Sequence, residues 1–263
     1  MSGNTSRRYP PELKQRAGRM VAQLQPDVVL MDVVMPEMDG LEATREIMMS
    51  TPTPIVMISA GIAGRETEVG FQALRQGALT LLSKPVSPVD ADFNTQADQI
   101  IRTLRAMANV HVIHHHKERR KPARSKRLDG METGQPAELV AIASSTGGPA
   151  ALAKILPELP SDFNKPIVIV QHIAADFVPS LVKWLSGLTP QHLGVAEHGD
   201  TPQSGHIYIA PGDHHLAFAD DGTFHLQTTP KTYHMPSADI FFESVARVYG
   251  ASTIGVILTG MGT

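Results

Sequence analysis

The chain has 263 residues, of which 42% are hydrophobic and 19% charged, a composition typical of a globular protein with room for two domains. It contains no cysteine, which excludes disulfides, thiolate catalysis and cysteine-based zinc sites. The net charge is −3, and there is no apolar run of about 18 residues and no signal peptide. We therefore expect a cytoplasmic protein that neither binds nucleic acid nor inserts into a membrane.

Helical segments alternate with short apolar runs in the first half of the chain. Gly77 stands where a glycine commonly closes a helix. This alternation predicts βαβ units and a parallel sheet. The pattern predicts helices at residues 12–24, 41–49, 66–76 and 95–107, and strands at 27–31, 55–59 and 79–82.

A basic segment separates the two halves. Lys117–Arg127 carries seven basic residues and one acidic residue, a net charge of +6 that leaves −9 for the remainder. Blocks of like charge are usually solvated, so we interpret residues 109–137 as a flexible linker, with a basic arm for an acidic partner as the alternative. The three histidines before the block, at 114–116, are taken as part of this linker. The predicted domains are residues 1–108 and 138–263.

The second half resumes the alternation of strands and helices, which predicts a doubly wound, Rossmann-like α/β domain. An Asp-Asp-Gly sequence joins two of its strands as a hairpin. The predicted strands are 139–143, 167–170, 205–210, 216–219, 223–227 and 253–258, and the predicted helices are 149–156, 178–185 and 237–248.

Three polar residues end the strands of the first half. Asp32, Ser59 and Lys84 follow successive strands, so they lie at the carboxyl edge of one sheet. A carboxylate nucleophile, a hydroxyl and an ammonium group could hold a phosphoryl group between them. An aspartate after a strand is more often a turn residue, and only the spacing of all three favours a site.

The series DVVLMDVVMPEMDG, PIVMISA and SKP resembles the receiver domain of two-component response regulators. The resemblance implies that Asp32 is the phosphoacceptor, Ser59 the switch hydroxyl and Lys84 the family's lysine, with Mg²⁺ required for phosphorylation. Receivers begin with a strand that ends in two acidic residues. The 31 residues before Asp32 contain no strand of this kind. We therefore expect an incomplete flavodoxin-like sheet and an incomplete Mg²⁺ site.

Ser145 and His172 are the candidate catalytic residues of the second half. Ser145 lies between a strand and a helix among small residues, as a nucleophile on a sharp turn requires. His172 is carried by an apolar strand to the same edge, where it could act as the base. The glycines after Ser145 fit a phosphate cradle or a plain helix cap equally well.

Five segments, AIASSTGGP, VIVQH, GHIYIAPGDHHL, HMPSADIFFESVA and GVILTGMG, resemble the catalytic domain of chemotaxis protein-glutamate methylesterases, the CheB family. The resemblance implies that Ser145 is the nucleophile and His172 the base, with Thr146 and Met261 lining the site and no cofactor or metal for the esterase. The family's aspartate would follow Thr263, so the chain is expected to be truncated at both ends and to lack the acid that orients His172.

The resemblance also implies a function and partners. The family hydrolyses glutamate methyl esters and deamidates glutamines on methyl-accepting chemoreceptors. Phosphorylation of the receiver by a chemotaxis histidine kinase relieves inhibition. One alternative is a non-catalytic fragment that binds the receptor or kinase, and another is a phosphate- or nucleotide-binding protein that uses the Ser-Thr-Gly-Gly-Pro turn.

Overall fold

The computed structural model describes two parts of the chain. The N-terminal part comprises residues 11–36, 38–60, 65–85 and 93–110, with Ser87, Val89 and Val112, and the C-terminal part comprises residues 136–230 and 235–258, with Thr232. Most of the predicted linker and Met261 lie outside these residues. No helix of the described residues is long and apolar enough to span a membrane.

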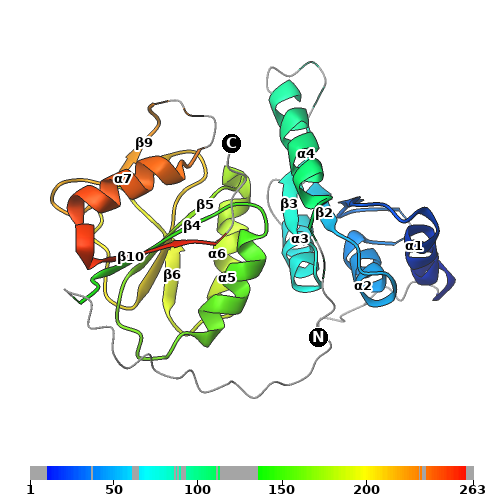
Figure 1. Cartoon of the computed structure of the whole chain (residues 1–263), viewed down its shortest axis with the longest axis horizontal. Helices are drawn as coiled ribbons and strands as arrows, with labels where there is room; N and C mark the ends of the chain where they lie inside the picture. Colours follow the sequence, from blue (N-terminus) through cyan, green and yellow to red (C-terminus); the bar gives the residue numbers. More distant parts are fainter. Residues whose placement is uncertain are drawn as a thin grey trace, which may run out of the picture.

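The N-terminal part is a three-stranded parallel sheet with helices around it (Figure 1). Helix α2 is capped by Asp39, which accepts a hydrogen bond of 2.9 Å from the Glu42 N–H. Gly77 has a φ of +113° after helix α3, as the sequence predicts. The elements are α1 (Pro11–Leu24), β1 (Val29–Asp32), α2 (Gly40–Ser50), β2 (Ile55–Ser59), α3 (Arg65–Arg75), β3 (Thr80–Ser83) and α4 (Phe93–Met107), with strand order β1-β2-β3.

The C-terminal part is a five-stranded parallel sheet and a separate hairpin. Its elements are β4 (Leu139–Ser144), α5 (Gly148–Ile155), β5 (Ile167–Gln171), α6 (Val178–Ser186), β6 (His192–Val195), β7 (His206–Ile209), β8 (His215–Phe218), β9 (Phe224–Gln227), α7 (Ala238–Val248) and β10 (Thr253–Ile257). The sheet has the order β10-β4-β5-β7-β6, with β8 and β9 forming the antiparallel hairpin. Both sheets confirm the predicted α/β class.

Helices cover both faces of the five-stranded sheet, which is why its central strands are apolar throughout. Ile142 and Ile169 face α5 and α6, where they pack with Leu152 and Leu181. Alternate residues of the same strands face α7 instead, whose Phe241 packs against the other face of the sheet. Figure 1 shows α7 on the opposite side of the sheet from α5 and α6.

The sequence analysis missed strand β6 and three short 3₁₀ helices, η1 (Leu156–Glu158), η2 (Ala175–Phe177) and η3 (Gly250–Ser252). Strand β6 is the outermost strand of its sheet, and Leu193 is its one buried residue. It therefore has neither an apolar run nor regular alternation, the two signals on which strand prediction rests.

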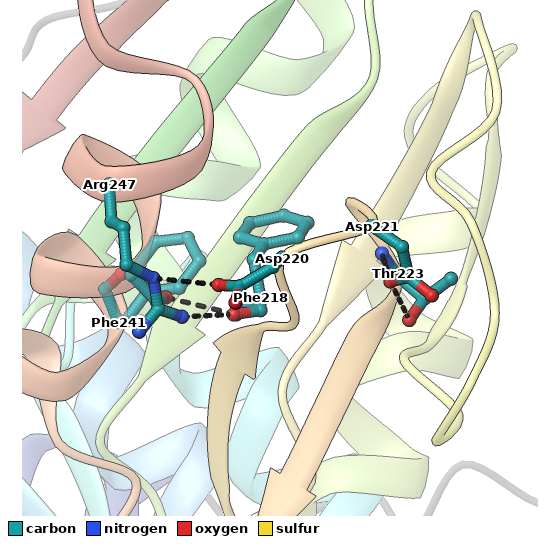
Figure 2. Close-up of polar contacts among 7 residues, drawn as sticks. Phe218, Asp220, Asp221, Thr223, Phe241 and Arg247 are labelled. Atoms are coloured by element: carbon teal, nitrogen blue, oxygen red, sulfur yellow. Dashed lines mark hydrogen bonds and ion pairs between the residues drawn. The ribbon is translucent and has the colours of Figure 1, made fainter.

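The hairpin is tied to α7 by an arginine (Figure 2). Arg247 donates from Nη2 to the Phe218 carbonyl at 2.7 Å, and its Nε lies 3.2 Å from a carboxylate oxygen of Asp220. In the turn, Asp221 accepts hydrogen bonds from the Thr223 hydroxyl and N–H, which lower the pKa of this carboxyl. These contacts hold the hairpin against the α7 face of the molecule.

The two parts pack against each other through α3. The Phe71 ring stacks on Trp184 of α6 with centroids 5.3 Å apart and an interplanar angle of 27°. Beside this pair, Lys183 of α6 forms an ion pair with Glu68 of α3. One hydrophobic cluster runs through both parts, including Phe71 and Leu81 on one side and Leu152 on the other. In Figure 1, α3 and α4 stand next to α5 and α6.

Candidate active site

Ser145 lies where the strand order of the larger sheet changes direction. From β4 the chain adds β5, β6 and β7 on one side, and it later returns to place β10 on the other side of β4. In open α/β sheets, ligands bind at the carboxyl ends of the strands at this switch point. Ile257 of β10 pairs with Ala143, two residues before Ser145. As the sequence predicts, Ser145 follows the carboxyl end of a strand, and the strand order gives its position along that edge of the sheet.

The two adjacent serines have different environments. Ser144 is the last residue of β4 and is buried, and its hydroxyl donates to Oε1 of Gln171 at 2.5 Å. Ser145 follows the strand, is half-buried and lines a cavity. The hydroxyl of Ser144 is therefore engaged inside the protein, which favours Ser145 as the nucleophile.

The cavity at Ser145 has a volume of about 140 Å³ and is lined by both parts of the molecule. The C-terminal part contributes Ser145, Thr146 and His172, so three of the four residues proposed for the esterase site line one space. The N-terminal part closes the opposite side with residues of α3, β3 and α4, among them Leu74, Ser83 and Gln99. The fourth residue, Met261, lies outside the described residues.

Gln171, which the sequence analysis did not single out, connects the chain segments that carry Ser145 and His172. It is 1% exposed and is the register partner of Ser144 in the neighbouring strand. Its Nε2 donates to the carbonyl of Ser145 at 2.9 Å and to that of His172 at 3.0 Å. A glutamine at the end of an otherwise apolar strand was the signal available in the sequence, since buried amides require partners.

The structure explains the two glycines after Ser145 in different ways. Gly147 has a φ of +79° and caps α5, a conformation that other residues seldom adopt. A Cβ on Gly148 would lie 2.1 Å from Oε1 of Gln171 and 2.7 Å from Oγ of Ser144. The space above Gly148 is thus filled by this hydrogen-bonded pair, which explains the glycine without a bound phosphate.

The N-terminal part brings its three predicted residues to one sheet edge. Nζ of Lys84 lies 2.5 Å from Oδ2 of Asp32, and the other carboxylate oxygen accepts from the Val34 N–H at 3.1 Å. Ser59 is buried at the end of β2, where its carbonyl accepts from the Lys84 N–H at 2.8 Å. Lys84 directly follows Ser83, which lines the cavity at Ser145.

Receiver domains generally bind Mg²⁺ at this edge. Among the described residues no group of three or more histidine, cysteine, aspartate or glutamate side chains could hold a metal ion. Mg²⁺ requires several oxygen ligands in near-octahedral geometry, and Asp32 provides one carboxylate that is already paired with Lys84. The described residues therefore do not fit a magnesium site by themselves.

Comparison with known proteins places this geometry in a family. A model described as CheB methylesterase matches residues 140–263, and one for the response regulator receiver domain matches residues 12–91. The protein-glutamate methylesterase/protein-glutamine glutaminase 4 of Myxococcus xanthus is 42% identical over 250 residues, 94% of this chain and 70% of that protein. The chain belongs to the CheB family of protein-glutamate methylesterases.

A second relative agrees with this assignment, and one solved structure is similar in sequence. The protein-glutamate methylesterase/protein-glutamine glutaminase 1 of Syntrophus aciditrophicus is 40% identical over 262 residues, 95% of this chain and 73% of that protein. The crystal structure of the CheB methylesterase catalytic domain of Thermotoga maritima is 41% identical, covering 49% of this chain and 70% of that chain with a TM-score of 0.46. In this chain the receiver match precedes the esterase match.

Proposed function

We propose that the protein hydrolyses methyl esters of glutamate side chains and deamidates glutamines on methyl-accepting chemoreceptors. The observation that carries the proposal is the meeting of Ser145, Thr146 and His172 around one cavity at the switch point of a CheB-type sheet. Relatives that match over more than 90% of the chain bear the names of both activities. Ser144 is buried and does not line the cavity, whereas Ser145 does, which supports Ser145 as the nucleophile.

In the proposed reaction, His172 takes the proton of the Ser145 hydroxyl as Oγ attacks the ester carbonyl carbon. The N–H of Thr146, which directly follows the nucleophile, would donate to the oxyanion of the tetrahedral intermediate. Collapse breaks the ester C–O bond, and His172 returns the proton so that methanol leaves. Water then attacks the acyl-serine by the same route and releases the glutamate carboxylate. A glutamine substrate releases ammonia in place of methanol.

The cavity shared by the two parts suggests how activity is controlled. Its volume of about 140 Å³ is below the roughly 300–1,000 Å³ of ordinary small-ligand pockets, so a receptor segment does not fit while the two parts are packed together. We propose that a phosphoryl group on Asp32, whose transfer requires Mg²⁺ ligands beyond the described residues, would separate the two parts. A phosphoryl group on Asp32 would compete for Lys84, whose neighbour Ser83 forms part of the cavity wall. Strand β3 would thus connect the two sites.

The partners follow from this proposal. The substrate is the methylated cytoplasmic segment of a chemoreceptor, and the phosphodonor is a chemotaxis histidine kinase, which would place the protein in the cytoplasm. The esterase residues provide nucleophile, base and oxyanion donor without a cofactor, and the proposed role of Ser59 is to contact the phosphoryl group on Asp32.

The test is methanol release from methylated receptor by Ser145→Ala and His172→Ala proteins. We expect each to lose activity by about 10³-fold or more, as removal of a nucleophile or base does in serine hydrolases. Ser161→Ala, which changes an exposed serine of the same part, should retain full activity. Methanol release at an undiminished rate by Ser145→Ala would disprove the assignment.

A further inference from the structure

The geometry points to Gln171 as the positioning residue that fixes Ser145 and His172 relative to each other. The inference rests on the proposed function of that pair. Neither residue's side chain is the target: Gln171 binds the main-chain carbonyls of both residues, at 2.9 Å and 3.0 Å. It therefore sets the positions of two chain segments from which the reacting groups project.

The hydrogen-bond partners determine which way the amide of Gln171 points. The Ser144 hydroxyl donates to Oε1, and Nε2 uses its two N–H groups on two carbonyl oxygens. The reversed orientation would place Oε1 against both carbonyls, where neither partner carries a hydrogen. One side chain thus satisfies three groups in a single arrangement, and Gln171 itself is 1% exposed, so its amide has little access to water.

Backbone pairing alone holds these segments less completely. The last ladder bond between the two strands runs from the His172 N–H to the Ser144 carbonyl at 2.9 Å. Beyond it the chains diverge, Ser145 into the turn before α5 and His172 toward η2. Gln171 adds two bonds just past the point where the sheet ends. A displacement of about 1 Å between reacting groups can reduce turnover a hundredfold, so such bonds matter to the reaction.

The absence of a side chain at position 148 supports the same role. The Cβ that any other residue would carry lies within 2.1 Å of Oε1 of Gln171. The first turn of α5 therefore keeps open the volume that the Ser144–Gln171 pair occupies. Of the two glycines after Ser145, Gly148 leaves the space that the Gln171 side chain occupies.

The test compares Gln171→Met with Gln191→Met. Gln191 is also buried, and its Nε2 donates to the Pro160 carbonyl at 2.9 Å, away from the site. We expect Gln171→Met to lower both kcat for methanol release and the rate of Ser145 phosphonylation by a fluorophosphonate, by about 10- to 100-fold. The KM should change little. Gln191→Met should match the wild-type protein in both measurements, even if it melts at a lower temperature.

A second variant tests the donor role directly and needs no change in size. Gln171→Glu retains an acceptor for Ser144, and its carboxyl has a proton to donate only in the neutral form. The ratio of its kcat to that of the wild-type protein should therefore fall as the pH rises, whereas a residue that merely fills space would give a constant ratio. Ser144→Ala removes the hydroxyl that donates to Oε1 of Gln171 but keeps both hydrogen bonds from Nε2. This variant should lose less activity than either Gln171 variant.

The outcomes separate this inference from the proposed function. If wild-type protein is phosphonylated at Ser145 but releases no methanol, the proposed substrate is wrong and the comparison of labelling rates still decides the role of Gln171. If Gln171→Met labels and turns over as fast as the wild-type protein, or if the Gln171→Glu ratio is independent of pH, the positioning role is overturned.

Discussion

The receiver site and the esterase site both lie at the carboxyl ends of parallel strands, yet they are held together differently. Asp32 and Lys84 form a direct ion pair whose side chains are 30% and 32% exposed. Ser145 and His172 are held through Gln171, a neutral residue that is 1% exposed. Asp32 and Lys84 are in contact through their side chains, whereas Gln171 binds the main-chain carbonyls of Ser145 and His172.

The difference matches what each site has to do. An ion pair with access to water contributes about 0–1 kcal/mol, so a phosphoryl group can displace it at little cost. A buried amide with three partners costs about 1–3 kcal/mol for each group left unsatisfied, so it resists rearrangement. The Asp32–Lys84 pair is thus the easier of the two arrangements to rearrange, and the α3 interface lies between this pair and the Gln171 contacts.

Of the three changes considered next, the largest effect is expected from filling the space beside Gln171 and Ser144. Gly148→Ala should lower kcat for methanol release roughly tenfold or more, because the new Cβ displaces Gln171 and Ser144. Overpacking should also reduce the free energy of unfolding by about 1–3 kcal/mol. Steady-state kinetics and denaturant melts measure the two effects. The control is Gly187→Ala, because a Cβ there meets no atom closer than 3.5 Å. Wild-type kinetics in Gly148→Ala would contradict the close approach seen here.

A smaller effect, in the opposite direction, is expected at the interface. Phe71→Leu should raise the methanol release of unphosphorylated protein, because it removes the ring that stacks on Trp184. Aromatic pairs contribute about 0.5–1.5 kcal/mol, which corresponds to a roughly two- to tenfold gain. Phe163→Leu, the same change at a half-buried ring in the loop before β5, should leave basal activity unchanged. A decrease in Phe71→Leu would show that the packed form is the active one.

The smallest effect is expected at the exposed ion pair of Glu68 and Lys183, whose side chains are 46% and 75% exposed. Glu68→Gln should raise basal activity by no more than about fivefold, with the gain shrinking at high salt, since such pairs contribute at most about 1 kcal/mol. The charge-reversed double variant, Glu68→Lys with Lys183→Glu, should return to the wild-type rate. A gain that persists at high ionic strength would mean that Glu68 acts through packing.

The sequence predicted both sheets and the edges that carry the candidate site residues, because buried parallel strands are apolar and end in recognisable polar residues. It placed Asp32, Ser59 and Lys84 on one edge, and Ser145 with His172 on another. Gln171 was not predicted because its contacts depend on its register partner Ser144 in another strand and on Gly148 in a helix. The packing of Phe71 on Trp184 was equally invisible, since nothing local distinguishes a residue of a domain core from one of an interface. Strand β6 was missed because it has a single buried residue.

Because both parts line the cavity, the proposed control of Ser145 by Asp32 also acts in the reverse direction. Two events that each require the same separation of α3 from α6 are thermodynamically linked, and the factor by which one favours the other is reciprocal. If a modified Asp32 makes Ser145 accessible, then a receptor segment seated at Ser145 must favour the modified form of Asp32 to the same degree. A densely methylated receptor would accordingly act as an effector of the receiver as well as a substrate of the esterase. Receptor binding at Ser145 and modification of Asp32 would each shift the equilibrium of the other.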